Sequence, residues 1–219
     1  MGRSRLALVI PAFNEAATVG PVVRGAALHG TVVVVDDASN DRTGALAQQA
    51  GADVVRHGQN RGYDGALESG FRRAAELGCE FVVTLDADGQ HNTELIAHFA
   101  AALERGADLV LGVRDRRQRF AEHIFAWFTR ARFGIHDPLC GMKGYRLALY
   151  KALGHFDSYG SIGTELALFA VRNGARFAQI PVATRPRADA PRFDWLLRAN
   201  QRILRSLLLG CFVRRDAAR

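Results

Sequence analysis

The sequence is poor in cysteine and in lysine. Three cysteines are present among 219 residues, and Cys79, Cys140 and Cys211 are widely spaced, with no C-x-x-C pair. This spacing argues against a structural zinc site and favours a reducing compartment. Only two of the 29 basic residues are lysines, so arginine carries the positive charge, and its planar guanidinium suits bidentate phosphate binding.

A long uninterrupted apolar run is also missing. The longest apolar stretch, residues 203–213, contains Arg205 and Ser206 and falls short of the ~20 residues that a membrane-spanning helix needs. Residues 1–11 hold too short an apolar run for a signal peptide. We therefore expect a soluble or peripheral protein.

What the chain does contain is an ordinary globular composition with an uneven distribution of charge. Hydrophobic residues make up 48% and charged residues 23%, which excludes disorder and fits one domain. The formal net charge of +7 alone suggests nucleic acid or an anionic membrane as partner. Residues 1–112, however, hold 9 basic against 14 acidic residues, whereas residues 183–219 hold 9 against 3. A simple nucleic-acid binder is not expected to divide its charge in this way.

Apolar runs alternate with amphipathic segments along the chain. We expect strands at residues 6–12, 31–35, 53–56, 81–85, 108–112, 141–146 and 175–182. We expect helices at residues 15–28, 43–50, 64–77, 93–104, 120–133, 162–173 and 193–213, and a loop at residues 183–192. Continuous apolar runs are typical of buried parallel strands, and the alternation is typical of βαβ units. The sequence therefore predicts an α/β fold with a mostly parallel sheet flanked by helices.

Polar residues follow three of the expected strands at the point where each strand ends. The stretches are PAFNE at residues 11–15, DD at residues 36–37 and DADGQ at residues 86–90. Ligands of open parallel sheets bind at this edge. Carboxylates gathered there would repel one another, and a divalent cation such as Mg²⁺ or Mn²⁺ would relieve the repulsion. Taken singly, a D-x-D is also compatible with a solvated turn, and the pair at 36–37 with a helix cap.

Together these motifs resemble those of the family 2 glycosyltransferases. A further stretch, DPLCGMK at residues 137–143, is similar to the D-x-x-S-G-F-[RK] motif of dolichol-phosphate mannosyltransferase and bacterial polyprenyl-phosphate glycosyltransferases. The resemblance runs from residue 6 to residue 192. It implies a GT-A fold, which is Rossmann-like, and an inverting, metal-dependent transfer of sugar from a UDP- or GDP-linked donor to a polyprenyl or dolichyl phosphate.

The resemblance also implies which residues bind the donor. Nucleotide-sugar contacts are expected from Pro11, Phe13, Asn14, Glu15, Asp37, Asp86, Ala87, Asp88, Arg114 and Arg187. The Mg²⁺ or Mn²⁺ ion is expected on Asp86, Asp88 and Gln90. Such an ion, helped by Arg187, would stabilise the charge that builds on the leaving diphosphate. The Gly, Ser and Lys that usually follow this arginine in the family are absent here.

A second group of residues is implied for the acceptor and for catalysis. Acceptor contacts are expected from Arg132, His136, Cys140 and Lys143, and catalytic roles from Asp88, Arg114 and Asp137. The oxygen of a lipid phosphate is already anionic, so it needs positioning by cations more than a general base. A saccharide hydroxyl would instead need a carboxylate base, for which Asp137 is the leading candidate. Cys140 stands where the family has serine, and a thiol is the weaker hydrogen-bond donor.

Several residues keep both a functional and a structural interpretation. Glu165 falls where the family often has an acidic residue beneath the site, and a surface glutamate is equally compatible with the sequence. His91 follows Gln90 directly and is either close to the metal or solvated. The histidines at positions 29, 57, 98, 123 and 155 are expected to be ordinary surface or core residues.

The C-terminal region predicts an amphipathic helix. Within residues 193–213 the arginines Arg198, Arg202 and Arg205 share one face, and leucines share another. This pattern is typical of helices that lie in the plane of an anionic membrane, and it also fits a helix docked on the protein. A second apolar stripe, at residues 120–131, is expected in the core or facing lipid. We therefore expect a catalytic domain at residues 1–192 and a basic amphipathic helix and tail at residues 193–219.

These expectations define partners, location and alternatives. Expected partners are a nucleotide-sugar, a polyprenyl phosphate, the membrane surface and a recruiting membrane protein, but not nucleic acid. The expected location is cytoplasmic, peripheral at the inner face of the cytoplasmic membrane. The alternatives are a glycosyltransferase with a saccharide hydroxyl acceptor in cell-wall or polysaccharide synthesis, and a non-catalytic nucleotide-sugar-binding protein. The sequence does not identify the nucleotide or the sugar.

Overall fold

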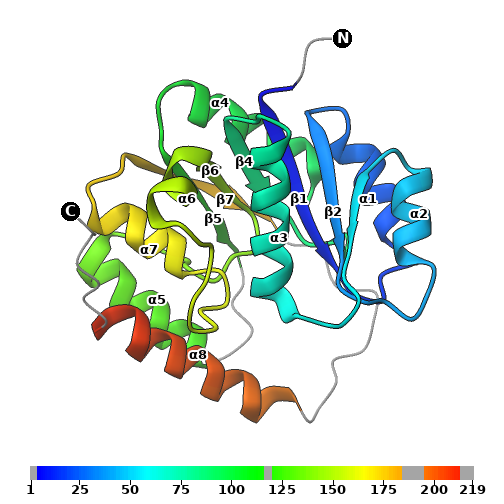
Figure 1. Cartoon of the computed structure of the whole chain (residues 1–219). Helices are drawn as coiled ribbons and strands as arrows, with labels where there is room; N and C mark the ends of the chain where they lie inside the picture. The colour runs from blue at the N-terminus through cyan, green and yellow to red at the C-terminus, as the bar shows by residue number, and fades with distance from the viewer. Residues whose placement is uncertain (1–3, 116–119, 184–194, 213–219) are drawn as a thin grey trace.

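A computed structural model describes residues 4–115, 120–183 and 195–212. These residues form a seven-stranded sheet with helices on both faces (Figure 1). Across the sheet the strands follow the order β3-β2-β1-β4-β6-β5-β7. Their bounds are β1 (Leu6–Ala12), β2 (Thr31–Asp36), β3 (Asp53–Arg56), β4 (Phe81–Thr84), β5 (Leu109–Arg114), β6 (Lys143–Arg146) and β7 (Phe177–Val182).

The helices form two layers and one separate pair. One face of the sheet carries α1 (Val19–Ala26), α2 (Thr43–Gln49) and α4 (Ile96–Glu104), with the short 3-10 helix Thr93–Leu95 ahead of α4. The other face carries α3 (Gly62–Glu76), α6 (Leu147–Leu153) and α7 (Glu165–Arg172). The separate pair consists of α5 (Phe120–Phe133) and α8 (Trp195–Phe212).

The buried strands explain why the sheet is covered on both sides. Along β1, Leu8 and Ile10 enter the core under α1 and α4, whereas Ala7 and Val9 enter the core under α3. All four side chains are fully buried. A strand buried on both faces reads as a continuous apolar run, as the sequence of β1 does.

The strand β6 is antiparallel to its neighbours in an otherwise parallel sheet. Its first residue, Lys143, pairs with Thr84 of β4 and with Leu111 of β5. Thr84 is the last residue of β4, so the start of β6 lies at the carboxyl ends of the parallel strands. The antiparallel direction thus brings the stretch at residues 137–143 to the same edge as the D-x-D stretch at residues 86–88.

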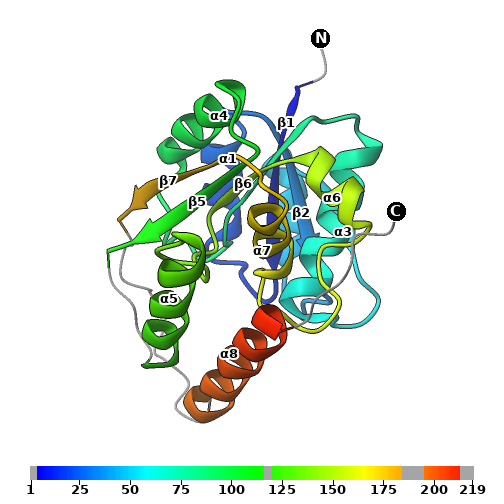
Figure 2. The same ribbon diagram turned by 90° about the vertical axis from the view of Figure 1, so that its left-hand side faces the viewer.

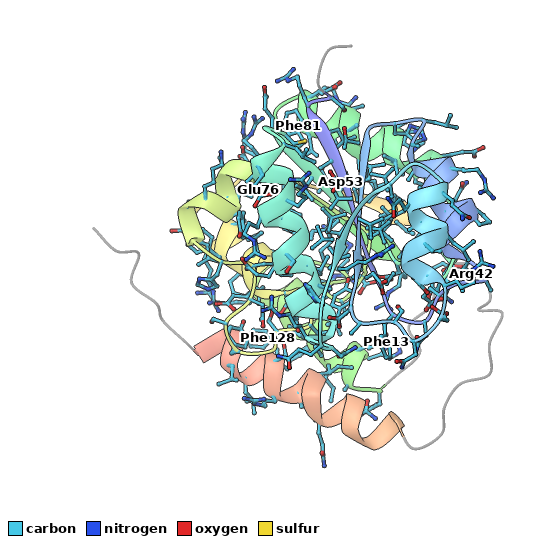
Figure 3. The ribbon with its side chains drawn as sticks, turned by 45° about the vertical axis from the view of Figure 1, so that its right-hand side comes forward. Phe13, Arg42, Asp53, Glu76, Phe81 and Phe128 are labelled. Carbon is cyan, nitrogen blue, oxygen red and sulfur yellow. The ribbon has the colours of Figure 1, made fainter. Side chains whose placement is uncertain are left out.

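The helices α5 and α8 pack against each other beyond the carboxyl edge of the sheet (Figure 2). Ala121 and Phe125 of α5 form an apolar cluster with Ile203 and Leu207 of α8. Figure 3 shows Phe128 of α5 at this end of the molecule. Within the described ranges, no helix is both long and apolar enough to cross a membrane.

The expected α/β architecture is confirmed, with differences at some element ends. The helix expected from residue 15 begins at Val19, because Glu15 instead opens a turn in which its carbonyl oxygen accepts from Thr18 N–H at 3.1 Å. The helix α6 was not expected from the sequence. The strand expected from Gly141 begins at Lys143, since the Gly141 carbonyl oxygen accepts instead from the Thr84 hydroxyl at 2.7 Å.

Candidate functional site

The loops that follow β1 and β2 are joined by hydrogen bonds at the carboxyl edge. Asn14 N–H donates to Ser39 Oγ at 3.0 Å, and Asn40 N–H donates to Asn14 Oδ1 at 2.9 Å. Glu15 N–H donates to Thr43 Oγ1 at 2.8 Å. Side chains of one loop thus satisfy backbone groups of the other, so the two loops form a single preorganised wall.

Backbone strain marks the same wall. Asn14 has φ 57° and Ala38 has φ 63°, values in the left-handed region that non-glycine residues seldom adopt. Such conformations cost about 1–3 kcal/mol each and persist where the surrounding structure fixes them, often at functional sites. Phe13, directly before Asn14, leaves 43% of its surface exposed, and Figure 3 shows it at the carboxyl edge. An exposed aromatic ring in a fixed polar wall provides a flat surface for stacking a base.

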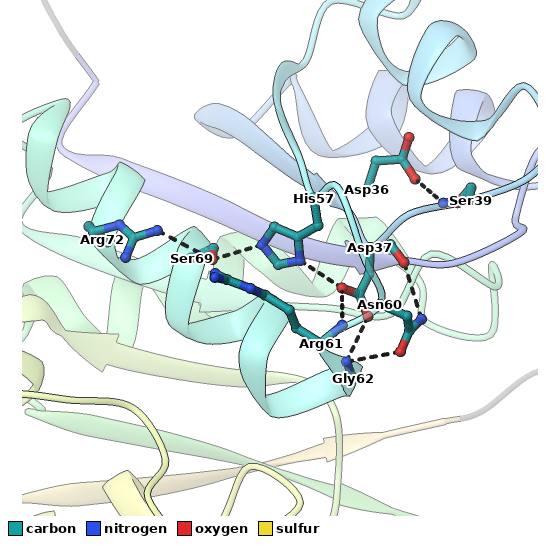
Figure 4. A network of polar contacts seen from close by, with 9 residues as sticks. All are labelled: Asp36, Asp37, Ser39, His57, Asn60, Arg61, Gly62, Ser69 and Arg72. Atoms are coloured by element: carbon teal, nitrogen blue, oxygen red, sulfur yellow. Dashed lines mark hydrogen bonds and ion pairs between the residues drawn. The ribbon is translucent and has the colours of Figure 1, made fainter.

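Asp37, which follows β2, is a buried hub of hydrogen bonds (Figure 4). Its Oδ1 accepts from Arg61 N–H at 2.8 Å and lies 2.6 Å from His57 Nδ1. Its Oδ2 accepts from Gly62 N–H at 2.8 Å, and its backbone oxygen accepts from Asn60 Nδ2 at 3.1 Å. Because α3 begins at Gly62, the carboxylate of Asp37 caps the amino end of that helix.

The partners of Asp37 were not foreseen from the sequence. A helix cap was one interpretation of the aspartate pair at residues 36–37, and Asp37 does cap a helix, α3, which lies beyond the next strand of the chain. His57, expected to be an ordinary residue, also has its Nε2 2.9 Å from Ser69 Oγ. No local pattern signals a contact between residues 20 positions apart, because it depends on how the loop after β3 closes.

The D-x-D stretch lies at the end of β4. Asp88 Oδ1 accepts from Gln90 N–H at 3.0 Å. Asp86 Oδ2 lies 3.8 Å from Nδ1 of His91, and His91 is buried rather than solvated. A Cβ on Gly141 would come within 2.3 Å of Asp86 Oδ2. A glycine at position 141 is therefore what leaves room for this carboxylate.

The chemistry of this edge fits a divalent cation held together with a phosphate ligand. In the described part of the chain, no three His, Cys, Asp or Glu side chains are grouped to hold a metal. Mg²⁺ is commonly held by one or two carboxylates plus substrate phosphates rather than by a complete protein cage. The residues that could supply oxygens are Asp86, Asp88 and Gln90. Ala87, between the two aspartates, has its side chain in the apolar core, so that side chain cannot contact a ligand.

Arg114, at the end of β5, is held by two buried carboxylates. Its Nε and Nη2 lie 2.7 and 3.0 Å from Oδ2 and Oδ1 of Asp137, and its Nη2 lies 3.2 Å from Oε2 of Glu122. Burial disfavours both charges of the Arg114–Asp137 pair, but the hydrogen bonds outweigh it, raising the pKa of Arg114 and lowering the pKa of Asp137. A carboxylate with a lowered pKa is a weak base, so this geometry argues against Asp137 as a general base.

The side chain of Cys140 does not reach the edge. It is fully buried in the apolar core, and a Cβ on Gly112 would lie 2.7 Å from its Sγ. Burial raises the pKa of the thiol to about 12. The thiol is turned inward toward β5, so an acceptor contact at Cys140 would have to come from its backbone N–H, and this role stays a prediction.

Lys143 is a buried cation at the same edge. Its Nζ donates to the carbonyl oxygen of Gly163 at 2.6 Å. Burial lowers the pKa of Lys143 to about 8, against the opposing charges of nearby acidic groups that include Asp64. The carboxylate of Asp64 accepts from Gly163 N–H at 2.6 Å and from Ile162 N–H at 3.2 Å. Lys143 thus binds the carbonyl oxygen of Gly163 and Asp64 binds its N–H, so the two side chains together fix the turn before α7.

The segment between α6 and α7 is anchored by carboxylates that accept backbone N–H groups. Glu165 accepts from Ser158 N–H at 2.6 Å and lies 3.1 Å from His155 Nε2. Glu68 of α3 accepts from Phe156 N–H at 2.6 Å. Glu165 is buried, so the interpretation of a surface glutamate is wrong. No local sequence pattern signals these anchoring roles, which set the shape of the turn next to Lys143.

The remaining expected residues lie apart from these contacts or outside the described chain. Arg132 is exposed near the end of α5, with its guanidinium 5.3 Å from the centre of the Phe133 ring. His136 is exposed, and its backbone N–H donates to Gln179 Oε1 at 2.8 Å. Arg187 lies outside the described residues, so its contribution stays a prediction.

Comparison with known proteins identifies similar enzymes. Residues 7–154 match the model of the family described as Glycosyl transferase family 2. The chain is 31% identical over 203 residues to the polyprenol monophosphomannose synthase of Mycolicibacterium smegmatis, covering 81% of this chain and 76% of the relative. It is 30% identical over 205 residues to the dolichyl-phosphate hexose transferase of Haloferax volcanii, covering 86% of each chain.

Solved structures with the same fold include a crystal structure of glucosyl-3-phosphoglycerate synthase from Mycobacterium tuberculosis in complex with Mn²⁺, uridine diphosphate and phosphoglyceric acid. It aligns with a TM-score of 0.78 and 23% identity, covering 98% of this chain and 81% of that one. At this identity the likeness concerns the fold, which is the GT-A arrangement that the family resemblance implied.

Proposed function

Because the chain belongs to glycosyl transferase family 2, we propose that it transfers a sugar from a nucleotide-linked donor to a polyprenyl phosphate. Two relatives support this proposal: the polyprenol monophosphomannose synthase, which is 31% identical, and an undecaprenyl-phosphate mannosyltransferase from Micrococcus luteus, which is 29% identical. The proposal rests on one observation: two features lie at the same edge of the sheet. The D-x-D carboxylates lie there, and so does the helix pair α5–α8 with its exposed apolar side chains.

The donor would lie across the carboxyl ends of β1, β2 and β4. The base would stack on Phe13 beside Asp37, and the diphosphate would approach the D-x-D carboxylates. Asp86, Asp88 and Gln90 would hold Mg²⁺ or Mn²⁺, which would offset the charge that develops on the leaving diphosphate. Structural neighbours crystallised with Mn²⁺ or Mg²⁺ and uridine diphosphate support the use of such an ion.

The acceptor phosphate would lie on the β5–β6 side of the edge. Its oxygen is anionic before the reaction, so the chain needs to orient it and to exclude water rather than to remove a proton. Lys143 supplies a cation there. Arg132 supplies an exposed cation nearer the proposed membrane surface. Arg114 supplies a third, although Asp137 and Glu122 balance its charge. The low basicity of Asp137 favours this acceptor over a saccharide hydroxyl, which would need a general base.

The helix pair α5–α8 would rest on the membrane that holds the acceptor. Phe120 and Trp127 of α5 leave 78% and 72% of their surfaces exposed, and Leu208 of α8 leaves 58% exposed. Exposed apolar side chains next to arginines such as Arg130 and Arg205 are typical of surfaces that bind anionic lipid. This proposal includes peripheral binding at the inner face of the cytoplasmic membrane, directly or with the help of a membrane protein.

The pair is also connected to the turn before α7. Ser206 of α8 donates through its hydroxyl to the carbonyl oxygen of Ser161 at 2.8 Å, and Ile162 packs against the α5–α8 cluster. Gly163, the next residue, accepts from Lys143. A continuous chain of contacts therefore runs from the proposed membrane surface to the proposed acceptor site.

Transfer assays test this function directly. The full chain, with Mn²⁺ or Mg²⁺, is mixed with vesicles that contain undecaprenyl phosphate and with a panel of UDP- and GDP-linked sugars. We expect release of nucleoside diphosphate and a glycosylated lipid, both dependent on metal and on acceptor. Asp88→Asn is expected to lower transfer about ten- to a hundredfold, since it replaces a charged proposed metal ligand by a neutral amide. Asp53→Asn, at the start of β3, is the matched control and is expected to keep activity.

The outcomes separate the alternatives. Transfer to free oligosaccharides but not to the lipid would reject the polyprenyl phosphate as acceptor. Full activity of Asp88→Asn would reject the assigned metal site. Binding of nucleotide-sugars with no transfer to any acceptor would favour a non-catalytic binding protein.

A further inference from the structure

The hydrogen bonds of Asp37 leave its carboxylate with little capacity to accept another. An ionised carboxylate has about four lone-pair sites on its two oxygens. Within the described chain, Oδ1 has His57 Nδ1 at 2.6 Å and Arg61 N–H at 2.8 Å, which fill both of its sites. Oδ2 accepts from Gly62 N–H at 2.8 Å, which fills one. A single site on Oδ2 remains, and it fits the 5% of the Asp37 side chain that is still exposed.

His57 prevents an incoming ligand from donating a hydrogen bond to Oδ1. Its side chain is 6% exposed, and its other ring nitrogen lies 2.9 Å from the hydroxyl of Ser69 on α3. A carboxylate only accepts, so Nδ1 must carry the proton of this bond, and the Ser69 hydroxyl can donate to Nε2. The ring is thus fixed from both sides (Figure 4). The two backbone donors belong to the amino end of α3 and cannot be displaced without unwinding the helix.

Uracil and guanine need different numbers of hydrogen-bond acceptors from such a carboxylate. The pairing edge of uracil presents one N–H donor, at N3, flanked by two carbonyl acceptors. The pairing edge of guanine presents two adjacent donors, the N1–H and the 2-amino group, which call for two free acceptors side by side. A guanine placed on Asp37 would keep one of these donors without an acceptor in a largely buried setting, which costs affinity.

From this arrangement we infer that the donor nucleotide is uridine diphosphate rather than guanosine diphosphate. His57 enforces that choice as a positioning residue, because it occupies the second acceptor that guanine would need. The inference rests on the proposed function, since it takes Asp37 as the residue that faces the base. Phe13 can stack on either base and does not contribute to the discrimination.

Nucleotide binding to the full chain tests the inference without any acceptor. Calorimetric titrations with UDP and with GDP, each in the presence of Mn²⁺, are expected to give tighter binding of UDP by at least about tenfold, the effect of one unsatisfied hydrogen bond. Equal or tighter binding of GDP would overturn the inference and leave the proposed function standing. Failure of both nucleotides to bind would reject the proposed function, and the inference with it.

Two substitutions of His57 test the positioning role. His57→Leu removes the donor to Oδ1 and is expected to reduce the ratio of UDP to GDP affinity severalfold, because the released acceptor can then serve guanine. His57→Asn can place its side-chain amide near the position of Nδ1, and it is expected to keep most of the ratio. A purely structural role of His57 would weaken both nucleotides equally in His57→Leu. An unchanged ratio in that variant, with its fold confirmed by circular dichroism, would contradict the assigned role.

Discussion

Arg114 and Asp137 form a bidentate ion pair at the carboxyl edge of the sheet, with Nε–Oδ2 at 2.7 Å and Nη2–Oδ1 at 3.0 Å. The Arg114 side chain is 16% exposed and that of Asp137 is 2% exposed. Both residues were expected to act directly in catalysis, yet each already has a charged partner in the structure. Their first effect is therefore to fix the end of β5 against the segment that leads into β6.

This pair makes a stability prediction. Asp137→Ala leaves Arg114 buried with Glu122 as its remaining carboxylate partner, and removal of one member of a buried pair costs about 3–5 kcal/mol. The free energy of unfolding, measured by denaturant titration, is expected to fall by that order. Asp53→Ala breaks the more exposed Arg73–Asp53 pair and is expected to cost less than about 1 kcal/mol. Equal losses in the two variants would show that the Arg114–Asp137 pair contributes no more than a surface ion pair.

Lys143 predicts a dependence of transfer on pH. Burial lowers its pKa to about 8, from an ordinary value of 10.5. As pH rises through about 8 the folded protein loses this charge, so the rate at low acceptor concentration is expected to fall on the alkaline side. The effect of rising pH on the stability of the fold has the opposite sign. The unfolded chain keeps the proton up to about 10.5, so the cost of burying the charge is relieved between these two values and the fold gains stability there.

Lys143→Gln separates the charge from the hydrogen bond. The amide of glutamine can still donate to the Gly163 carbonyl oxygen, but it carries no charge. We expect kcat/KM for the lipid acceptor to drop roughly tenfold at pH 7, which is the effect of one charge-assisted hydrogen bond. We also expect the decrease of kcat/KM above pH 8 to be absent in this variant. A variant that retains the decrease would assign it to another group.

The proposed membrane surface predicts a difference between two exposed apolar residues. Trp127→Asp places a charge on the exposed face of α5 and is expected to lower sedimentation with vesicles of anionic lipid severalfold. Leu28→Asp is the matched control. Leu28 is 83% exposed, but it follows α1 at the amino edge of the sheet, away from the α5–α8 pair. Equal binding by the two variants would reject this pair as the membrane surface.

The contact between α3 and β1 predicts a cost for one added methyl group. A Cβ on Gly70 would lie 2.2 Å from Cγ1 of the buried Val9, and overpacking of this kind costs about 1–3 kcal/mol. Gly70→Ala is therefore expected to lower the midpoint of thermal unfolding. Gly20→Ala on α1, where the nearest atom is the end of the Arg24 side chain at 3.4 Å, is expected to be neutral or stabilising. A stable Gly70→Ala variant would mean that α3 can move outward at little cost.

Much of the fold could be read from local patterns. The strand Leu6–Ala12 and the helix Phe120–Phe133 have the bounds that the sequence predicted, because a run buried on both faces and a helical stripe are signals between near neighbours. The helix Leu147–Leu153 escaped prediction. It is seven residues long and directly follows β6, so no turn signal separates the two.

The candidate site could be located, although its contacts could not be predicted. The D-x-D stretch was expected at the carboxyl edge and lies there, since the direction of a parallel sheet brings the carboxyl ends of its strands together. Lys143 lies at the same edge because β6 is antiparallel, a direction that the sequence did not predict. Cys140 was assigned to the acceptor because of its place in a motif, but its thiol faces the core. A motif gives the order of residues, whereas the side of the backbone on which each one lies depends on the register with β5.

The sequence by itself determined the α/β class, the family and the edge of the sheet at which the polar residues gather. These properties follow from periodicity and motif spacing, which act over a few residues. The tertiary structure decided which partner each carboxylate has: His57 for Asp37, Arg114 for Asp137 and the Ser158 backbone for Glu165. Such pairings depend on loop closure and strand order over longer stretches of chain, and burial then makes each pairing obligatory, because a buried charge without a partner costs several kcal/mol.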